Sequence, residues 1–229
     1  MKHDISLAQL QSEELASCYR DIETKFEVRS LYSRISYVSP INFVESSGSP
    51  RHRWFPYKEG FSPSFVRSVV EEARLEDDAV VLDPFSGVGS TCITVAGMGY
   101  HSLGIEVSPL ANFVAKTKCL SEDQLDMGEI GKLFKTLESP RSRRSVDPPE
   151  NETVRSYFHK EIFKAILEVK WLITETKAAE SMLLKLALLA NLEMFSTHRR
   201  AGNGVKRKSK PPAELTLSEA RTWISQALA

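Results

Sequence analysis

The stretch from Ala79 to Glu106 constrains the fold of this chain more than any other. It begins with an apolar run, 80–82, of the kind that a strand buried on both faces carries. Residues 83–89 follow with glycines at 87 and 89, where a backbone turns sharply or approaches a ligand closely. The pattern then predicts a helix over 90–96 and a second buried strand over 103–105, which ends at an acid. This order predicts a nucleoside site at the carboxyl ends of parallel strands, and an acid about 20 residues after the loop is suited to binding ribose hydroxyls.

Composition limits the kinds of function without choosing one. A chain of 229 residues forms one large domain or two small ones. Lys and Arg number 30 and so do Asp and Glu, so nucleic-acid binding has to rest on a local basic patch. The three cysteines have no paired spacing and indicate neither a disulfide framework nor a zinc site, so we expect no bound metal. With no signal peptide and no apolar run that could span a bilayer, we expect a cytoplasmic protein without a membrane partner.

Two motifs carry a family resemblance. The segments Asp83-Pro84-Phe85-Ser86-Gly87-Val88-Gly89-Ser90-Thr91 and Gly104-Ile105-Glu106 resemble the cofactor motif of S-adenosylmethionine-dependent DNA amino-methyltransferases. Enzymes of this family methylate N6 of adenine or N4 of cytosine. The resemblance implies S-adenosylmethionine as cofactor, DNA as substrate and an α/β fold with a Rossmann-like class I methyltransferase sheet.

The chemistry of the cofactor suits these residues. S-adenosylmethionine has a carboxylate, an ammonium group, a ribose and a sulfonium, but no phosphate. Backbone N–H groups around Gly87 and Gly89, at the start of a helix, can face the carboxylate. Asp83 would accept from the ammonium group directly or reach it through water. Glu106 would bind the two ribose hydroxyls, and an ordinary surface acid after a strand is the alternative for Glu106. With the neighbours that the motif implies, the candidates for cofactor binding in this stretch are Asp83, Pro84, Phe85, Ser86, Gly87, Gly89, Thr91, Glu106, Val107 and Ser108.

A second pocket segment is expected just before the glycine loop. The family resemblance implies it, and Lys58, Phe61 and Ser62 are the candidates for the methionine end of the cofactor. The alternative is an aromatic-rich hydrophobic plug with solvated basic residues. Ser62 followed by Pro63 also predicts the start of a helix.

We expect three parts along the chain. Residues 1–50 form an N-terminal helix and lead-in, because apolar residues recur there at helical spacing. Residues 51–125 form the cofactor-binding α/β core, in which Ser108-Pro109 predicts another helix start. Residues 126–229 form a helical block with a basic loop. One helix is predicted over 154–173, where apolar residues recur at helical spacing, and another over the apolar run 182–195. A capping box of Thr216 and Glu219 predicts the start of a last helix.

The basic loop is the candidate for DNA contacts. Residues 199–210 predict a flexible, strongly basic segment that ends at Pro211-Pro212. Cationic side chains of this kind bind phosphates. A solvated linker is the alternative. The candidate nucleic-acid-binding residues are Arg199, Arg200, Lys206, Arg207 and Lys208.

The catalytic motif of the family has no convincing match in the 229 residues. That motif is Asp, Asn or Ser followed by Pro-Pro and an aromatic, which together hold the target amine and stack on a flipped base. Asp147-Pro148-Pro149 has the right start, but Glu150 replaces the aromatic and a charged loop precedes it. A proline-rich linker turn fits these residues better, with a degenerate catalytic loop as the alternative. The segment Lys210-Pro211-Pro212-Ala213 lacks the polar side chain.

The sequence therefore favours the cofactor-binding N-terminal part of a DNA methyltransferase, with an incomplete sheet and a helical C-terminal block. Three alternatives stay open for the catalytic half: it is lost, it is cut off at a gene boundary, or a second polypeptide supplies it. We expect little or no methyl transfer to DNA by this chain alone. Two other interpretations remain open. One is an RNA or small-molecule methyltransferase, because the glycine loop reports the cofactor more firmly than the substrate. The other is a non-catalytic subunit that binds the cofactor.

Overall fold

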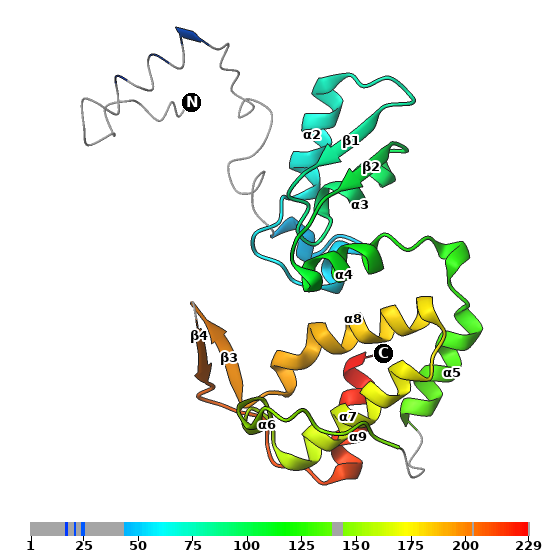
Figure 1. Cartoon of the computed structure of the whole chain (residues 1–229), viewed down its shortest axis with the longest axis vertical. Coiled ribbons are helices and arrows are strands. Elements are labelled where there is room, and N and C mark those ends of the chain that lie inside the picture. Colours follow the sequence, from blue (N-terminus) through cyan, green and yellow to red (C-terminus); the bar gives the residue numbers. More distant parts are fainter. Residues whose placement is uncertain are drawn as a thin grey trace.

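The structure is a computed structural model, and it describes residues 17, 21, 24, 25, 44–138, 144–202 and 204–228. The helix expected within residues 1–28 and the segment 29–43 lie outside this range, apart from four residues. Figure 1 shows an upper part built from residues before about 120 and a lower, helical part. The fold is mixed α and β, with a parallel pair of strands in the upper part and an antiparallel pair in the lower part.

The upper part carries the glycine loop. Its strands are β1 (Val80–Asp83) and β2 (His101–Gly104), which pair in parallel with Leu82 opposite Leu103. Three helices belong to the same part: α2 (Pro63–Ala73), α3 (Ser90–Gly97) and α4 (Pro109–Lys118). Short 3-10 turns occupy Glu45–Ser47, His52–Trp54 and Glu122–Gln124.

Local capping explains where two of these helices begin. The Ser62 hydroxyl accepts a hydrogen bond from the Phe65 amide at 3.2 Å, and the Ser108 hydroxyl accepts one from the Ala111 amide at 3.4 Å. In each case proline takes the first helical position, where no N–H is needed. Both helix starts predicted from the sequence are confirmed.

The parallel pair is covered on one face only, which corrects the expectation of two strands buried on both faces. Val81 packs with Val66, Val70 and Val95 from α2 and α3. On the opposite face the described residues leave apolar side chains open to solvent. Val80 is 63% exposed, Leu82 57% and Leu103 58%. The apolar sequence was interpreted correctly as strand, but burial depends on elements that pack on the second face.

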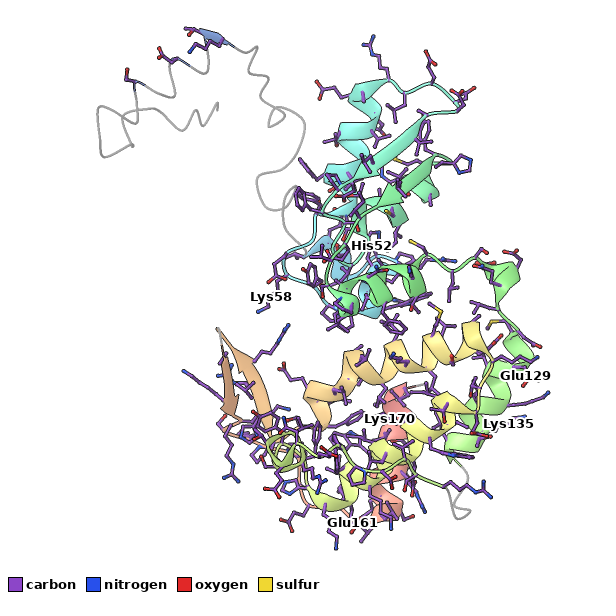
Figure 2. The ribbon with its side chains drawn as sticks, in the orientation of Figure 1. His52, Lys58, Glu129, Lys135, Glu161 and Lys170 are labelled. Carbon is purple, nitrogen blue, oxygen red and sulfur yellow. The ribbon has the colours of Figure 1, made fainter. Side chains whose placement is uncertain are left out.

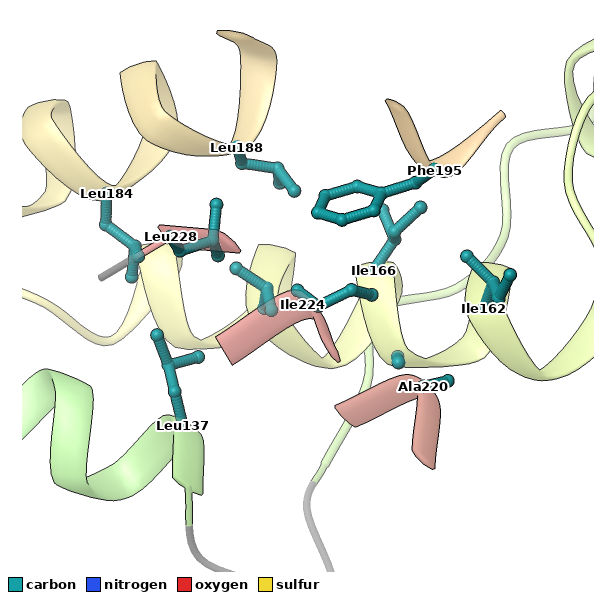
Figure 3. Packing of buried hydrophobic residues seen from close by; sticks show 11 residues of the cluster. Leu137, Ile162, Ile166, Leu184, Leu188, Phe195, Ala220, Ile224 and Leu228 are labelled. Atoms are coloured by element: carbon teal, nitrogen blue, oxygen red, sulfur yellow. The ribbon is translucent and has the colours of Figure 1, made fainter. Parts of the chain in front are cut away.

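The lower part is a block of helices around its own core. Its helices are α5 (Met127–Glu138), α6 (Glu152–Ser156), α7 (Lys160–Thr174), α8 (Ala178–Phe195) and α9 (Leu217–Leu228). Figure 3 shows the core between them, where Ile162, Ile166, Leu188, Phe195 and Ile224 meet. The capping box predicted at the start of α9 is confirmed, since Glu219 accepts from the Thr216 amide at 2.8 Å and the Thr216 hydroxyl accepts from the Glu219 amide at 3.3 Å.

The stripe over 154–173 forms two helices, although its spacing predicted one. The chain leaves the helix at Tyr157 and becomes extended at His159 before α7 begins. The Tyr157 carbonyl accepts hydrogen bonds from the Thr197 amide at 2.7 Å and from the Ser196 hydroxyl at 3.0 Å. A contact with residues so far along the chain cannot be predicted from local periodicity.

Helix α8 joins the two parts. Leu184 and Leu188 pack in the core of the helical block, whereas Leu186 packs with Val88 and Val114 of the upper part. The apolar run that predicted a well-buried helix therefore serves two cores on opposite sides. Figure 1 shows α8 lying between α4 above and α7 and α9 below. The Nζ atom of Lys185 also lies 4.5 Å from the centre of the Phe113 ring.

The basic segment after α8 is a β-hairpin, which corrects the expectation of a flexible loop. Strands β3 (His198–Ala201) and β4 (Gly204–Arg207) pair antiparallel, with Arg199 opposite Lys206. Gly202 has φ +57° in the turn between them. The sequence Gly-Asn-Gly at 202–204 is typical of hairpin turns and could have predicted this element.

Candidate functional site

The glycine loop sits at the carboxyl ends of β1 and β2, as the sequence predicted. The Ser86 amide and hydroxyl both donate to the Ile105 carbonyl, at 3.0 and 3.2 Å. The Ile105 amide in turn donates to the Asp83 carbonyl at 2.9 Å. The Asp83 carboxylate accepts from the Phe85 amide at 3.0 Å, which shapes the start of the loop. These bonds hold the loop against the segment that leads to Glu106.

Both glycines of the loop adopt positive φ angles. Gly87 has φ +51°, and a side chain there would meet the Tyr57 ring at 3.3 Å. Gly89 has φ +82°, and a side chain there would meet the Ala115 Cβ of α4 at 3.0 Å. Other residues are strained at such angles, so the shape of the loop depends on glycine at both positions.

Gly104 is needed for a different reason. A Cβ atom at this position would lie 2.8 Å from the Ser86 Cβ and 3.0 Å from the Cys92 sulfur. The end of β2 therefore packs directly under the loop. This contact explains why the second motif of the family resemblance begins with glycine.

The loop leads into α3, and no described side chain caps the backbone N–H groups at the start of this helix. Gly89 is the residue before the helix and makes no side-chain cap. The first amides of a helix lack intrahelical partners and attract anions. On the neighbouring segment, Glu106 is half-buried and one carboxylate oxygen accepts from the Ser108 amide at 2.6 Å. Helix amides and a fixed carboxylate thus stand at the same edge of the sheet, where an anionic group and a hydroxylated group can be bound together.

The mouth of the loop is open rather than covered. Phe85 is 88% exposed and Val107 is 93% exposed. Both were candidates for cofactor contact, and both stand clear of the hydrophobic cores. Pro84 is also exposed, whereas Thr91 is half-buried at the start of α3.

The three candidates before the loop differ in accessibility. Lys58 and Phe61 are exposed, and the Phe61 ring lies 5.2 Å from the Phe65 ring. Ser62 is fully buried and caps α2. Figure 2 shows Lys58 at the surface of the upper part and His52 among its ribbons.

Tyr57 is the neighbour of the loop that sequence reasoning did not single out. Its ring is the nearest group to Gly87. Burial raises the pKa of the Tyr57 phenol, the charges of Glu59 and Glu106 raise it further, and Arg200 of the hairpin opposes them. Tyr57 therefore lies within electrostatic range of both the candidate ribose acid and the hairpin. One signal for it was available in the sequence: Tyr57 lies next to Lys58, inside the segment expected to complete the pocket.

The pocket segment is fastened to α4 by two basic side chains that cross between them. The Lys118 ammonium donates to the carbonyls of His52 and Phe55, at 2.9 and 3.2 Å. In the opposite direction the Arg51 guanidinium donates to the carbonyls of Lys118 and Leu120. Burial lowers the pKa of Lys118 to about 8, and burial together with the charge of Lys118 lowers the pKa of His52 to about 4. The segment before the loop is thereby held in a fixed position beside Val88 and Ser90, with which it lines a cavity of about 100 Å³.

The proline-rich segment lies in the helical block. The Val146 amide donates to the Leu167 carbonyl of α7 at 3.4 Å, and the Pro149 carbonyl accepts from Arg155 at 2.8 Å. Asp147 and Pro148 are exposed. These contacts belong to α6 and α7, and none of them joins the segment to the glycine loop.

Comparison with known proteins identifies the relationship. The chain is 33% identical over 97 residues to the type II methyltransferase M.BsoBI of Geobacillus stearothermophilus, and 27% identical over 176 residues to M.AvaI of a Nostoc species. It is also 34% identical over 86 residues to M.MjaII of Methanocaldococcus jannaschii. The chain is similar in sequence to type II methyltransferases over part of its length. The family resemblance seen in the two motifs is thereby confirmed.

The chain matches only part of each methyltransferase. The aligned regions cover 42%, 71% and 38% of this chain, but 19%, 34% and 15% of M.BsoBI, M.AvaI and M.MjaII, respectively. No protein-family model and no solved structure matches it. Among the helices that the structure describes, none has the length and apolar character to cross a membrane.

Proposed function

We propose that this chain is the cofactor-binding part of an S-adenosylmethionine-dependent DNA methyltransferase. The observation that carries the proposal is the shared position of the glycine loop and Glu106 at one edge of a parallel strand pair. Ligands of α/β sheets bind outside the carboxyl ends of such strands. The relationship to type II methyltransferases supports the same function, and the strand pair would form the centre of a Rossmann-like class I sheet.

The residues fit the chemistry of the cofactor. The carboxylate of S-adenosylmethionine would face the first amides of α3, next to Gly87 and Gly89, and its ammonium group would face Asp83. Glu106 would accept from the ribose hydroxyls through the oxygen that does not bind the Ser108 amide. When bound, the cofactor supplies an electrophilic methyl group. The chain itself would orient that methyl toward the open mouth beside Phe85 and Val107.

Cofactor binding is the direct test. Isothermal titration with S-adenosylhomocysteine or S-adenosylmethionine should give a heat of binding. Glu106→Gln should weaken the affinity by roughly 10- to 150-fold, because charge-assisted hydrogen bonds contribute about 1.5–3 kcal/mol. Gly87→Val should abolish binding, because the side chain meets the Tyr57 ring and requires a strained φ angle.

Matched controls separate the pocket from general effects. Glu76→Gln removes an exposed acid away from the loop, and Gly97→Val adds a side chain where nothing lies within 4 Å. Both variants should bind like the unchanged protein. A folded protein that gives no heat of binding would contradict the proposal.

We further propose that the catalytic half docks on the open face of the strand pair. The occupant would be a polypeptide that carries an aromatic-ended Pro-Pro motif, with helices that cover this face and parallel strands that extend the sheet at its edges. Two observations support it. Val80, Leu82, Leu103 and Ile105 form one exposed apolar face, although parallel sheets are normally covered on both faces. The regions of M.BsoBI, M.AvaI and M.MjaII that align with this chain are only 19%, 34% and 15% of their lengths.

Reconstitution tests this second proposal. We expect no incorporation of labelled methyl groups into DNA by the chain alone, and incorporation after addition of a neighbouring-gene product that carries the Pro-Pro-aromatic motif. Leu82→Lys with Leu103→Lys should prevent both the association and the methylation. Val69→Lys is the control, because Val69 is an exposed apolar residue of α2 outside the sheet. Methyl transfer by the isolated chain would contradict the proposed partner. So would a homodimer of this chain that the double variant abolishes, because a second copy would then cover the open face.

A further inference from the structure

The hairpin β3–β4 concentrates positive charge in an arrangement that is unfavourable by itself. Arg199 lies directly opposite Lys206, and Arg207 follows Lys206 along β4. Like charges in such cross-strand pairs destabilise a sheet. Within the part of the chain that the structure describes, no acidic side chain pairs with Arg199, Lys206 or Arg207, and all three are exposed. This arrangement of like charges therefore favours a polyanionic ligand, which would supply the negative charge that the described residues do not provide.

The base of the hairpin is anchored, so its charges are presented in a fixed place. The Lys208 amide donates to the Thr197 carbonyl at 2.9 Å, and the Tyr157 and His198 rings lie 4.7 Å apart. The Lys208 ammonium donates to the carbonyls of Glu193 and Met194 at the end of α8. Lys208, a candidate DNA contact from the sequence, thus serves as an anchor of the hairpin. The cations that pair with no acid among the described residues, Arg199, Lys206 and Arg207, are on the strands beyond it.

The hairpin projects toward the part of the molecule that carries the cofactor loop (Figure 1). The charge of Arg200 acts on Tyr57, whose ring in turn touches the position of Gly87. Figure 1 shows β3 and β4 projecting from the end of α8 on the side of the upper part. A long ligand held by the hairpin, such as a nucleic-acid duplex, would therefore extend toward the part that carries the loop.

We propose that the β3–β4 hairpin enters the major groove of duplex DNA and holds it beside the cofactor loop. This inference rests on the proposed function and specifies how the substrate is gripped. A two-stranded ribbon fits the major groove of B-DNA, which is about 12 Å wide. The major groove of duplex RNA is too deep and narrow for such an element, so the geometry favours DNA. The cations on both strands would reach the phosphates that line the groove, while the tip at Gly202 faces the base edges.

Fluorescence anisotropy with a short labelled DNA duplex tests the proposal. Arg199→Gln with Lys206→Gln should weaken binding on the order of 10- to 100-fold near 0.1 M salt and reduce the slope of log K against log salt by about 2. The control is Lys164→Gln with Lys170→Gln, which removes the same net charge from the exposed face of α7. The control should change the affinity by less than about threefold, because distant surface charges are screened.

Two further measurements identify the groove and the ligand. Dimethyl sulfate methylates guanine N7 in the major groove, and the unchanged chain should protect guanines that the hairpin variant leaves reactive. An RNA duplex of the same sequence should bind more weakly and lose little affinity in the hairpin variant. Equal losses in the hairpin and control variants, equal losses on RNA and DNA, or no measurable DNA binding would overturn the inference. Because cofactor titration is measured separately, a chain that binds S-adenosylmethionine but fails these tests would refute the hairpin proposal alone.

Discussion

Gly89→Ala is expected to lower the free energy of unfolding by roughly 3 kcal/mol and to abolish cofactor binding. Two costs combine. The φ angle of +82° is strained for alanine by about 1–2 kcal/mol. The new methyl would also lie 3.0 Å from the Ala115 Cβ and 3.2 Å from its Cα, and overpacking of this kind costs about 1–3 kcal/mol.

Gly99→Ala separates these two costs. Gly99 has φ +88°, close to that of Gly89, but nothing lies within 4 Å of the added methyl. Urea denaturation should therefore show a loss of about 1–2 kcal/mol, and the cofactor should still bind. The difference between the two variants measures the contact between the loop and α4. Equal losses in both variants, or a Gly89→Ala protein with unchanged affinity, would show that the close approach of α4 does not shape the loop.

Features that depend on neighbouring residues were predictable from the sequence. Ser62-Pro63 and Ser108-Pro109 mark helix starts because capping involves only the next few residues. The glycine loop and Glu106 meet at one edge because parallel strands joined by a short helix leave only that arrangement. The core of the candidate site is of this local kind.

Features that depend on distant residues were not predictable. The Arg51 side chain reaches the Lys118 carbonyl, 67 positions away, and no pattern in either segment indicates it. The helix is interrupted between α6 and α7 because the Thr197 amide donates a hydrogen bond to the Tyr157 carbonyl. The open face of Leu82 and Leu103 was expected to be buried, because an apolar strand looks the same whether or not a neighbour covers it.

Arg221→Ala is expected to lower the free energy of unfolding by about 3–5 kcal/mol, because it would leave a carboxylate buried without a partner. Glu168 on α7 is 2% exposed, and Arg221 on α9 donates to its two oxygens at 2.7 and 2.6 Å. Glu168 raises the pKa of Arg221 further above its ordinary value. The pair joins two helices of the block that carries the hairpin, so its loss should also weaken binding of DNA.

The cost should come from the orphaned charge rather than from loss of the bond itself. Glu168→Leu combined with Arg221→Leu removes both charges, and the double variant should recover most of the lost stability, because a buried ion pair contributes little over apolar packing. Arg155→Ala is the surface control: the Arg155 side chain is exposed and, among the residues described, donates only to the Pro149 carbonyl, so its removal should cost less than about 1 kcal/mol. Urea denaturation of the three variants checks the order. A double variant as unstable as Arg221→Ala would mean that the bidentate contact itself holds α9 against α7.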